Sequence, residues 1–166
     1  LRTADALSGI DLDTTVTSLD ADVTGTGTIN IADTDALTVI KANTFDGTIE
    51  LSGTSLLVSE VNAGNENVTL IASSDGITDG NAGTNNITGN LLTADALSGI
   101  DLVNTSTSVD ADVTGTVTIN IADTDALTVI KANTFDGPYD LSGPSLLVSE
   151  FNAVNETVTL RDSSDG

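Results

Sequence analysis

The stretch TINIADTDALTVIKANTFDG occurs twice in the chain, at residues 28–47 and 118–137, without a single change. Over the full overlap, residues 1–76 and 91–166 differ at only fifteen positions. The chain is therefore built from two ninety-residue tandem units, 1–90 and 91–166, the second of them incomplete. We expect one continuous structure over residues 1–166.

A shorter period lies inside each unit. Pairs of apolar residues separated by one polar residue recur in steps of 19 or 20 residues, at Ile10/Leu12, Ile29/Ile31, Ile49/Leu51 and Val68/Leu70. Ile87 follows after 19 residues and Ile100 after 13 more. Such alternation is typical of a strand with one buried face, and a fixed period near twenty residues is typical of a solenoid. We predict a mainly β fold, a parallel β-solenoid with 19–20 residues per rung.

This fold predicts where single residues lie. The first apolar residues of the pairs should form interior columns about 4.8 Å apart, Ile10, Ile29, Ile49 and Val68 in the first unit and Ile100, Ile119, Tyr139 and Val158 in the second. The residues between the apolar pairs should form an outward polar column of Asp11, Asn30, Glu50, Thr69 and Thr88.

The rest of each rung has two interpretations. In residues 33–47, Leu37 and Ile40 have helical spacing and Gly47 is a typical helix stop, whereas Thr38 and Val39 favour a strand. Short helices completing some rungs and a second strand per rung therefore both stay open. An alternative fold is a pair of immunoglobulin-like β-sandwiches, which would explain the ninety-residue period but not the inner one.

Composition limits the chemistry. The chain has no Cys and no His, so disulfides, Cys/His zinc sites and imidazole catalysis are excluded. A net charge of −21 with only four cationic residues argues against nucleic acid and anionic membrane surfaces as partners. No run of eighteen apolar residues is present, so we expect no membrane insertion. Three Phe and one Tyr are too few for the sugar cleft of a glycosidase, and we predict that the chain is not an enzyme.

Calcium is the cofactor that the composition favours, because hard cations prefer several carboxylate and carbonyl oxygens. The nonapeptide of calcium-binding β-rolls and the EF-hand spacing are both absent. Asp also occurs at turns for purely structural reasons, so the acids alone do not assign a site. The candidate ligands are the closely spaced carboxylates Asp20, Asp22, Asp33, Asp35, Asp75, Asp79, Asp110, Asp112, Asp123 and Asp125.

The rungs rich in Thr, Asp, Asn and Gly, as in GTINIADTDALTVIKANTFDGTIELSG, resemble the repeat regions of very large bacterial surface proteins, especially cyanobacterial ones, and of some S-layer proteins. The resemblance implies an extracellular, structural or adhesive role. A calcium-dependent surface-layer or glycan-binding domain is the alternative. Neutral glycans and other surface proteins are then the expected partners.

Two expectations concern the join and the ends. Leu91, Leu92, Ala94 and Leu97 predict that the core continues from one unit into the next, and the polar segment 79–86 before them should be an exposed turn. The terminal rungs of a solenoid expose unpaired strand edges, so we expect end-to-end self-association.

Overall fold

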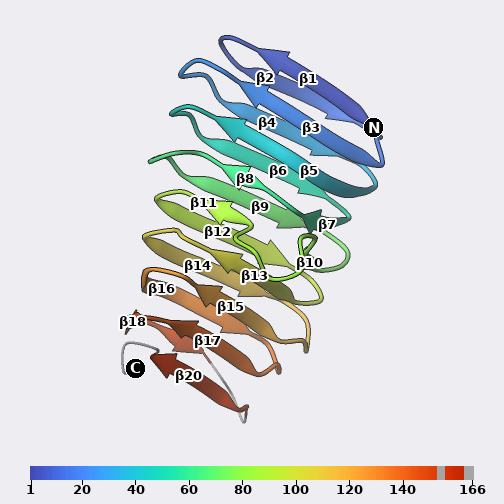
Figure 1. Ribbon diagram of the computed structural model, residues 1–166. Coiled ribbons are helices and arrows are strands. Elements are labelled where there is room, and N and C mark those ends of the chain that lie inside the picture. The colour runs from blue at the N-terminus through green and yellow to red at the C-terminus, as the bar shows by residue number, and fades with distance from the viewer. Residues whose placement is uncertain (153–155, 163–166) are drawn as a thin grey trace.

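The protein is a parallel β-solenoid of about eight turns, seen in a computed structural model that describes residues 1–152 and 156–162. The described residues form twenty strands and no helix. Every pairing between these strands is parallel, and each strand stacks on the strand one turn earlier (Figure 1). The predicted fold class is confirmed, and the immunoglobulin-like alternative is wrong because a sandwich would pair its strands antiparallel.

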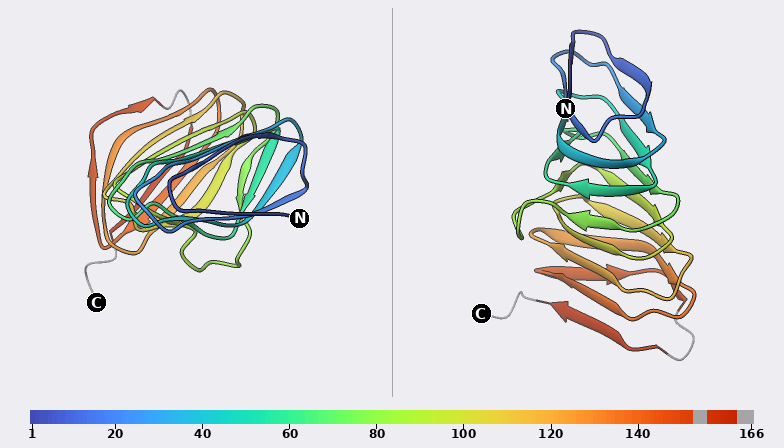
Figure 2. Two further views of the ribbon diagram at one scale, coloured as in Figure 1. Left: turned by 90° about the horizontal axis from the view of Figure 1, so that it is seen from above. Right: turned by 90° about the vertical axis from the view of Figure 1, so that its right-hand side faces the viewer.

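The strands form two sheets. The eleven-stranded sheet contains β1 (Arg2–Ala6), β3 (Ser18–Val23), β5 (Ala36–Thr44), β7 (Ser55–Val58), β8 (Val61–Asn62), β10 (Ile77–Asp79), β11 (Ile87–Thr88), β13 (Ile100–Asn104), β15 (Ile119–Asp123), β17 (Tyr139–Gly143) and β20 (Val158–Asp162). The nine-stranded sheet contains β2 (Ile10–Thr14), β4 (Ile29–Asp33), β6 (Ile49–Gly53), β9 (Val68–Ala72), β12 (Leu91–Ala96), β14 (Ser108–Val113), β16 (Ala126–Thr134), β18 (Ser145–Val148) and β19 (Phe151–Asn152). Viewed along the stack, the turns superpose as a flattened coil whose two long sides are the sheets (Figure 2).

The core lies between the sheets as a single narrow cluster of Ile, Leu, Val and Ala side chains that includes residues of both units. Alternate residues of each strand point into it, as in β4, where Ile29 and Ile31 are buried and Asn30 is exposed. The strands β9 and β12 pair across the join, with Val68 opposite Leu92. Hydrogen bonding and the core are therefore continuous between the two units.

The register of both predicted columns is confirmed, and their members are buried except Val158, which is 39% exposed on the last described strand. Ile10, Ile29, Ile49 and Val68 are consecutive Cα partners on β2, β4, β6 and β9. Ile100, Ile119, Tyr139 and Val158 are consecutive partners on β13, β15, β17 and β20. The outward column is confirmed from Asp11 to Thr69, but Thr88 is not part of it, since it pairs with Asn62 in the other sheet.

The two columns lie on opposite sheets although their sequences are copies. From β1 to its copy β12 the chain passes between the sheets nine times, which is an odd number of half-turns. Ninety residues therefore make four and a half turns, which average twenty residues per turn. Every surface feature that the two units share is consequently displayed on opposite faces of the solenoid.

The segment left open between helix and strand is a strand in both units. β5 runs over nine residues, and its Leu37 and Val39 point into the core. Ile40 instead forms a β-bulge, because Leu19 pairs with Val39 while the next residue, Asp20, pairs with Lys41. The bulge leaves Ile40 44% exposed, so its helical spacing from Leu37 does not reflect a shared buried face.

The predicted step from Val68 to Ile87 is wrong. Val68 pairs with Leu92, 24 residues later, because a loop between β10 and β11 lengthens this turn. The loop is exposed at residues 82–84, with positive φ at Ala82 (61°) and Gly83 (85°), and it protrudes from the stack (Figure 2). The predicted exposed turn over residues 79–86 is confirmed only in part, since Asn86 at its end is 1% exposed. The loop breaks the regular spacing of the rungs.

The corners between strands depend on glycine. An added Cβ at Gly47 would lie 2.0 Å from the carbonyl oxygen of Gly27 in the preceding turn. At Gly137, the equivalent position of the second unit, it would lie 2.2 Å from the carbonyl oxygen of Val117. Consecutive turns can approach this closely only where no side chain stands between them.

Candidate functional site

The first group of candidate carboxylates lies where β4 and β15 end. Asp33 is 7% exposed, and its carboxylate accepts hydrogen bonds from the hydroxyl of Thr14 and from the backbone N–H groups of Val16 and Asp35, the latter two at 2.8 Å. Burial raises the pKa of Asp33, but these hydrogen bonds outweigh burial and leave the pKa below its ordinary value. Asp35 supplies a backbone N–H here and its own carboxylate is exposed, so the pair forms a turn.

The second copy of this corner is different. Asp123 is also 7% exposed and accepts a hydrogen bond from the N–H of Asp125 at 2.7 Å, but it lacks the hydroxyl and backbone N–H donors that Thr14 and Val16 provide to Asp33. Burial raises the pKa of Asp123 to about 6, and the nearby charge of Asp125 adds to the rise, while hydrogen bonds from the Asp125 N–H and the Asn104 side chain lower it. The difference arises because Thr14 and Val16 are replaced by Asn104 and Ser106.

The pairs Asp20/Asp22 and Asp110/Asp112 lie on the outer faces of β3 and β14, on opposite sheets. The Nζ of Lys41 contacts Asp22 at 2.7 Å, and Lys131 makes the same ion pair with Asp112. The hydrogen bond to Asp22 is the main reason why the pKa of Lys41 lies above its ordinary value. Each acidic pair therefore already has a cation of the protein beside it.

Asp95 adds a further acid beside Asp112, its partner on β14. Burial raises the pKa of Asp95, and the charges of Asp112 and Asp110 raise it further, while Lys131 lowers it. Sequence reasoning left Asp95 out of the candidate ligands because Asp112 and Asp110 are seventeen and fifteen residues away in the chain and come beside it only through the strand register.

The remaining candidates lie at the join. Asp79 holds the protruding loop, since its carboxylate accepts the N–H of Asn81 at 2.7 Å, the N–H of Gly83 at 2.6 Å and the Nδ2 of Asn86 at 2.9 Å. Burial raises the pKa of Asp79, but these hydrogen bonds leave it below its ordinary value. Asp75 is exposed and accepts a hydrogen bond from the Ser98 hydroxyl.

The predicted acids do not converge on one centre. Within residues 1–152 and 156–162, no three acidic side chains form a group that could hold a metal ion. Carboxylates of Asp33 and Asp79 are instead hydrogen-bonded to neighbouring backbone N–H groups, and those of Asp22 and Asp112 are paired with lysine. Calcium binding by these residues stays a prediction.

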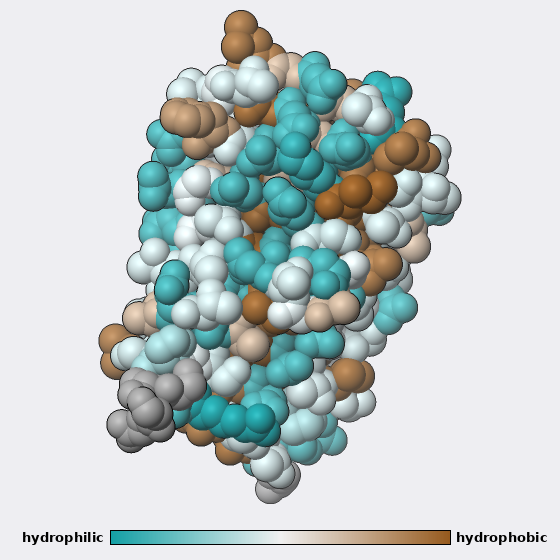
Figure 3. Space-filling view, in the orientation of Figure 1, coloured by the Kyte–Doolittle hydropathy of each residue, from teal (hydrophilic) through white to brown (hydrophobic). Residues whose placement is uncertain are grey.

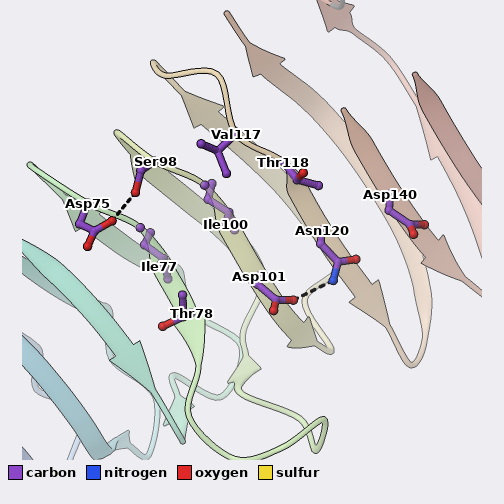
Figure 4. Close-up of a pocket in the computed structure, with 12 residues that line it drawn as sticks. Asp75, Ile77, Thr78, Ser98, Ile100, Asp101, Val117, Thr118, Asn120 and Asp140 are labelled. Carbon is purple, nitrogen blue, oxygen red and sulfur yellow. Dashed lines mark hydrogen bonds between the residues drawn. The ribbon is translucent and has the colours of Figure 1, made fainter. Parts of the chain in front are cut away.

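A groove of about 460 Å³ lies over the eleven-stranded sheet at the join (Figure 4). Its polar wall is the outward row Asp101, Asn120 and Asp140, on β13, β15 and β17, and the Nδ2 of Asn120 donates to Asp101 at 2.7 Å. Asp75, Ser98 and Val117 lie in a row along its upper rim. The groove offers hydrogen-bonding groups in a row but contains no aromatic ring.

A second groove, of about 430 Å³, contains an aromatic side chain. Phe45 is 76% exposed at the corner after β5 and lies beside Asp22, Asn43 and Asn62, which are consecutive partners in the sheet register. The second unit repeats this set on the opposite sheet, with Phe135 73% exposed, as Asp112, Asn133, Asn152 and Phe135. An exposed ring next to amide and carboxylate groups is an arrangement that can contact the apolar face and the hydroxyls of a sugar.

The space-filling view shows hydrophilic residues over most of one face, interrupted by separate apolar patches (Figure 3). No helix in the described part of the chain is long and apolar enough to cross a bilayer. The sequence matches no protein-family model, and the comparisons with curated proteins and with solved structures gave no match.

Proposed function

We propose that the chain is a structural and adhesive module, a rigid rod segment of a large bacterial surface protein that acts outside the cell. The continuous stack of parallel strands supports this role, because a solenoid of this kind extends by a fixed rise for every turn. The observation that carries the proposal is the four-and-a-half-turn repeat, which places the shared surface of successive units on opposite faces. The equivalent surfaces of two successive units lie about 22 Å apart along the solenoid axis, because each turn adds ~4.8 Å.

The length of the rod tests this role. Chains with two, four and six ninety-residue units should form rods that lengthen by about 22 Å per unit in electron micrographs or small-angle scattering. A maximum dimension that does not increase linearly with the number of units would reject the rigid-rod proposal.

End-to-end association belongs to the same proposal, and the internal join provides its template. Within the chain β9 pairs with β12, and Ile71 lies opposite Asp95. β20 and β1 are the copies of these strands, so stacking β20 of one molecule on β1 of another would place Arg161 opposite Asp5. Arg161 contacts Asp140 at 3.1 Å in its own chain, and a position beside Asp5 would give it a second carboxylate.

Charge exchange separates this contact from unspecific aggregation. In sedimentation across a concentration series, R161D and D5R should each weaken association, and the two variants mixed together should regain it. Lys41→Asp is the matched control, because its charge change is the same but it lies away from both ends of the stack. Equal behaviour of R161D and K41D would contradict the proposed contact.

Neutral glycan binding is a second candidate function, favoured by the groove at Phe45. A sugar ring there would pack on the exposed phenyl face and use the amides of Asn43 and Asn62. F45A should weaken binding of a neutral oligosaccharide in calorimetry, and F45A/F135A should abolish it, whereas L7A, which removes another exposed apolar side chain, should not. Unchanged binding in F45A/F135A, or no binding by the wild-type chain, would reject this candidate.

A further inference from the structure

One edge of the nine-stranded sheet is open where its copy in the first unit is covered. β18 and β19 repeat the sequences of β7 and β8 with a single change, Phe151 in place of Val61. β7 and β8 pair with β5 on one side and with β10 and β11 on the other. Among residues 1–152 and 156–162, β18 and β19 pair with β16 alone.

The open edge presents apolar side chains. In the first unit, the inward side chains of β7 and β8 are at most 1% exposed beside β10 and β11. Their copies on β18 and β19 are Leu146, Val148 and Phe151, which are only partly buried although they pack against the same core. A strand added at this edge would therefore bury apolar surface as well as pair backbone groups.

The first unit shows how one residue of the added strand fits this edge. Asn86 is 1% exposed, and its carbonyl oxygen accepts the N–H of Val61 at 2.7 Å. Its side-chain Nδ2 donates to the carbonyl oxygen of Val58 at 2.8 Å. The corresponding groups on the open edge are the N–H of Phe151 and the carbonyl oxygen of Val148.

Side chains specific to the second unit hold the open edge in place from inside. Tyr139, which replaces Ile49, is 1% exposed and donates from its hydroxyl to the carbonyl oxygen of Asn152 at 2.7 Å. Its ring meets that of Phe151 edge to face, with the ring centroids 5.3 Å apart. An edge that is already ordered loses less conformational entropy when a strand binds to it.

We propose that β18 and β19 form a docking site for an extended segment with the sequence pattern of residues 77–88, ITDGNAGTNNIT, supplied by a neighbouring polypeptide. The segment adds a parallel strand to the nine-stranded sheet. Its first Ile covers Leu146, its second Ile covers Phe151, and its Asn side chain donates to Val148. The register is that of the first unit, where Ile77 lies opposite Leu56 and Ile87 lies opposite Val61.

The pairing in the first unit also selects this edge over the opposite end of the sheet. β2 is the copy of β13, which lies on the far side of β10 and β11. β10 and β11 pair with β7 and β8 over five residues but with β13 over only two. Residues 77–88 contain one acidic residue, Asp79, so the net charge of −21 on the chain repels such a segment only weakly.

A peptide titration tests the site in the whole chain. The synthetic peptide ITDGNAGTNNIT, added to the ¹⁵N-labelled protein, should shift the NMR amide signals of β18 and β19. The signals of β7 and β8 should stay unchanged, because β10 and β11 already occupy the matching edge. A spin label placed before the first Ile of the peptide should broaden the Leu146 signal more than the Phe151 signal, as the parallel register requires.

Variants of the peptide test the contacts without changing the fold of the chain. Asn86→Asp in the peptide should weaken binding about tenfold, because the carboxylate cannot donate to Val148. I77D/I87D in the peptide should abolish binding. The site lies on the other sheet from the proposed contact of Arg161 with Asp5 and does not depend on it, so R161D should bind the peptide as the wild-type chain does.

Three results would overturn the proposal. The first is the absence of shifts on β18 and β19 at millimolar peptide. The second is an equal response to a scrambled peptide of the same composition. The third is a response confined to β2, which would place the segment at the opposite end of the sheet.

Discussion

The two copies of one aspartate should respond to pH in opposite directions. Burial without full hydrogen bonding raises the pKa of Asp123 from 3.8 to about 6, whereas hydrogen bonding outweighs burial at Asp33 and lowers its pKa. The folded protein therefore binds the Asp123 proton more tightly than the unfolded chain. The stability that this proton provides is complete below pH 3.8 and is lost as the pH rises through about 6. Asp33 contributes stability above pH 3.8, which is lost as the pH falls through its lowered pKa.

The size of the effect follows from the shift. At about 1.4 kcal/mol per pKa unit, the rise from 3.8 to about 6 corresponds to ~3 kcal/mol lost between pH 4 and pH 7. The hydrogen bonds from the Asp125 N–H and the Asn104 side chain act against burial, and the rise to about 6 already includes them. Among the titratable neighbours, Asp125 acts in the same direction as burial.

N104T/S106V isolates this contribution. The variant restores a hydroxyl donor and frees a backbone N–H for Asp123, so its stability relative to the wild-type protein should rise by up to ~3 kcal/mol between pH 4 and pH 7. Urea unfolding at several pH values measures this double difference, which cancels the titration of the other acids. Carboxyl carbon NMR titration of Asp123 and Asp33 measures the two pKa values directly. A stability difference independent of pH, or equal pKa values for the two residues, would refute the reasoning.

Three further predictions concern stability and metal. I31A, at a fully buried position, should cost about 2–5 kcal/mol, whereas I40A, at the exposed bulge, should cost less than about 1 kcal/mol; similar losses in urea unfolding would contradict the assigned bulge. K41Q should lower the free energy of unfolding by less than about 1 kcal/mol, because Lys41 and Asp22 are both partly exposed. This loss should become smaller in high salt. A loss that does not change with salt would mean that the ion pair matters more than its exposure implies. Removal of calcium with EDTA should leave the thermal midpoint unchanged if the acids act only as hydrogen-bond acceptors and lysine partners, and a fall restored by added calcium would support the calcium prediction.

The interior columns could be predicted from the sequence because the spacing of 19 or 20 residues allows few other structures. Ile10, Ile29, Ile49 and Val68 are separated by single turns, and each is followed after one polar residue by a second apolar residue. Residues that alternate in this way and recur at the turn length can all be buried only if successive turns stack in register. The spacing of the apolar residues therefore predicts the register of these strands.

The strand at residues 36–44 could not be decided from the sequence, for a physical reason. Its bulge shifts the alternation by one residue at Ile40, which interrupts the two-residue period that identifies a strand. The step to Ile87 was misjudged for a related reason. The loop between β10 and β11 lengthens one turn. A constant period of about 19 residues would place Ile87 next to Val68 in the interior column, but the residue that pairs with Val68 is Leu92.

The environment of the candidate acids could not be predicted from the sequence, because it depends on which strand lies beside each acid. Asp33 and Asp123 belong to an identical stretch of twenty residues, and local sequence assigns them the same properties. Their pKa values move in opposite directions because the neighbour on the preceding turn is Thr14 in one copy and Asn104 in the other. The ion pairs of Lys41 and Lys131 likewise require the register of the strands.

The half-turn in each repeat connects the fold to the proposed role. A repeat of eight or ten half-turns would place every copy of Phe45 on one face of the rod, and an array would then present a single binding face. Nine half-turns place Phe45 and Phe135 on opposite sheets, so successive units face alternate directions. A partner that binds this surface can thus attach on both sides of the rod, and two neighbouring rods can share it. Each ninety-residue unit is suited to joining structures on both sides of the rod because it contains an odd number of half-turns. Neither the composition nor any single motif reveals this number.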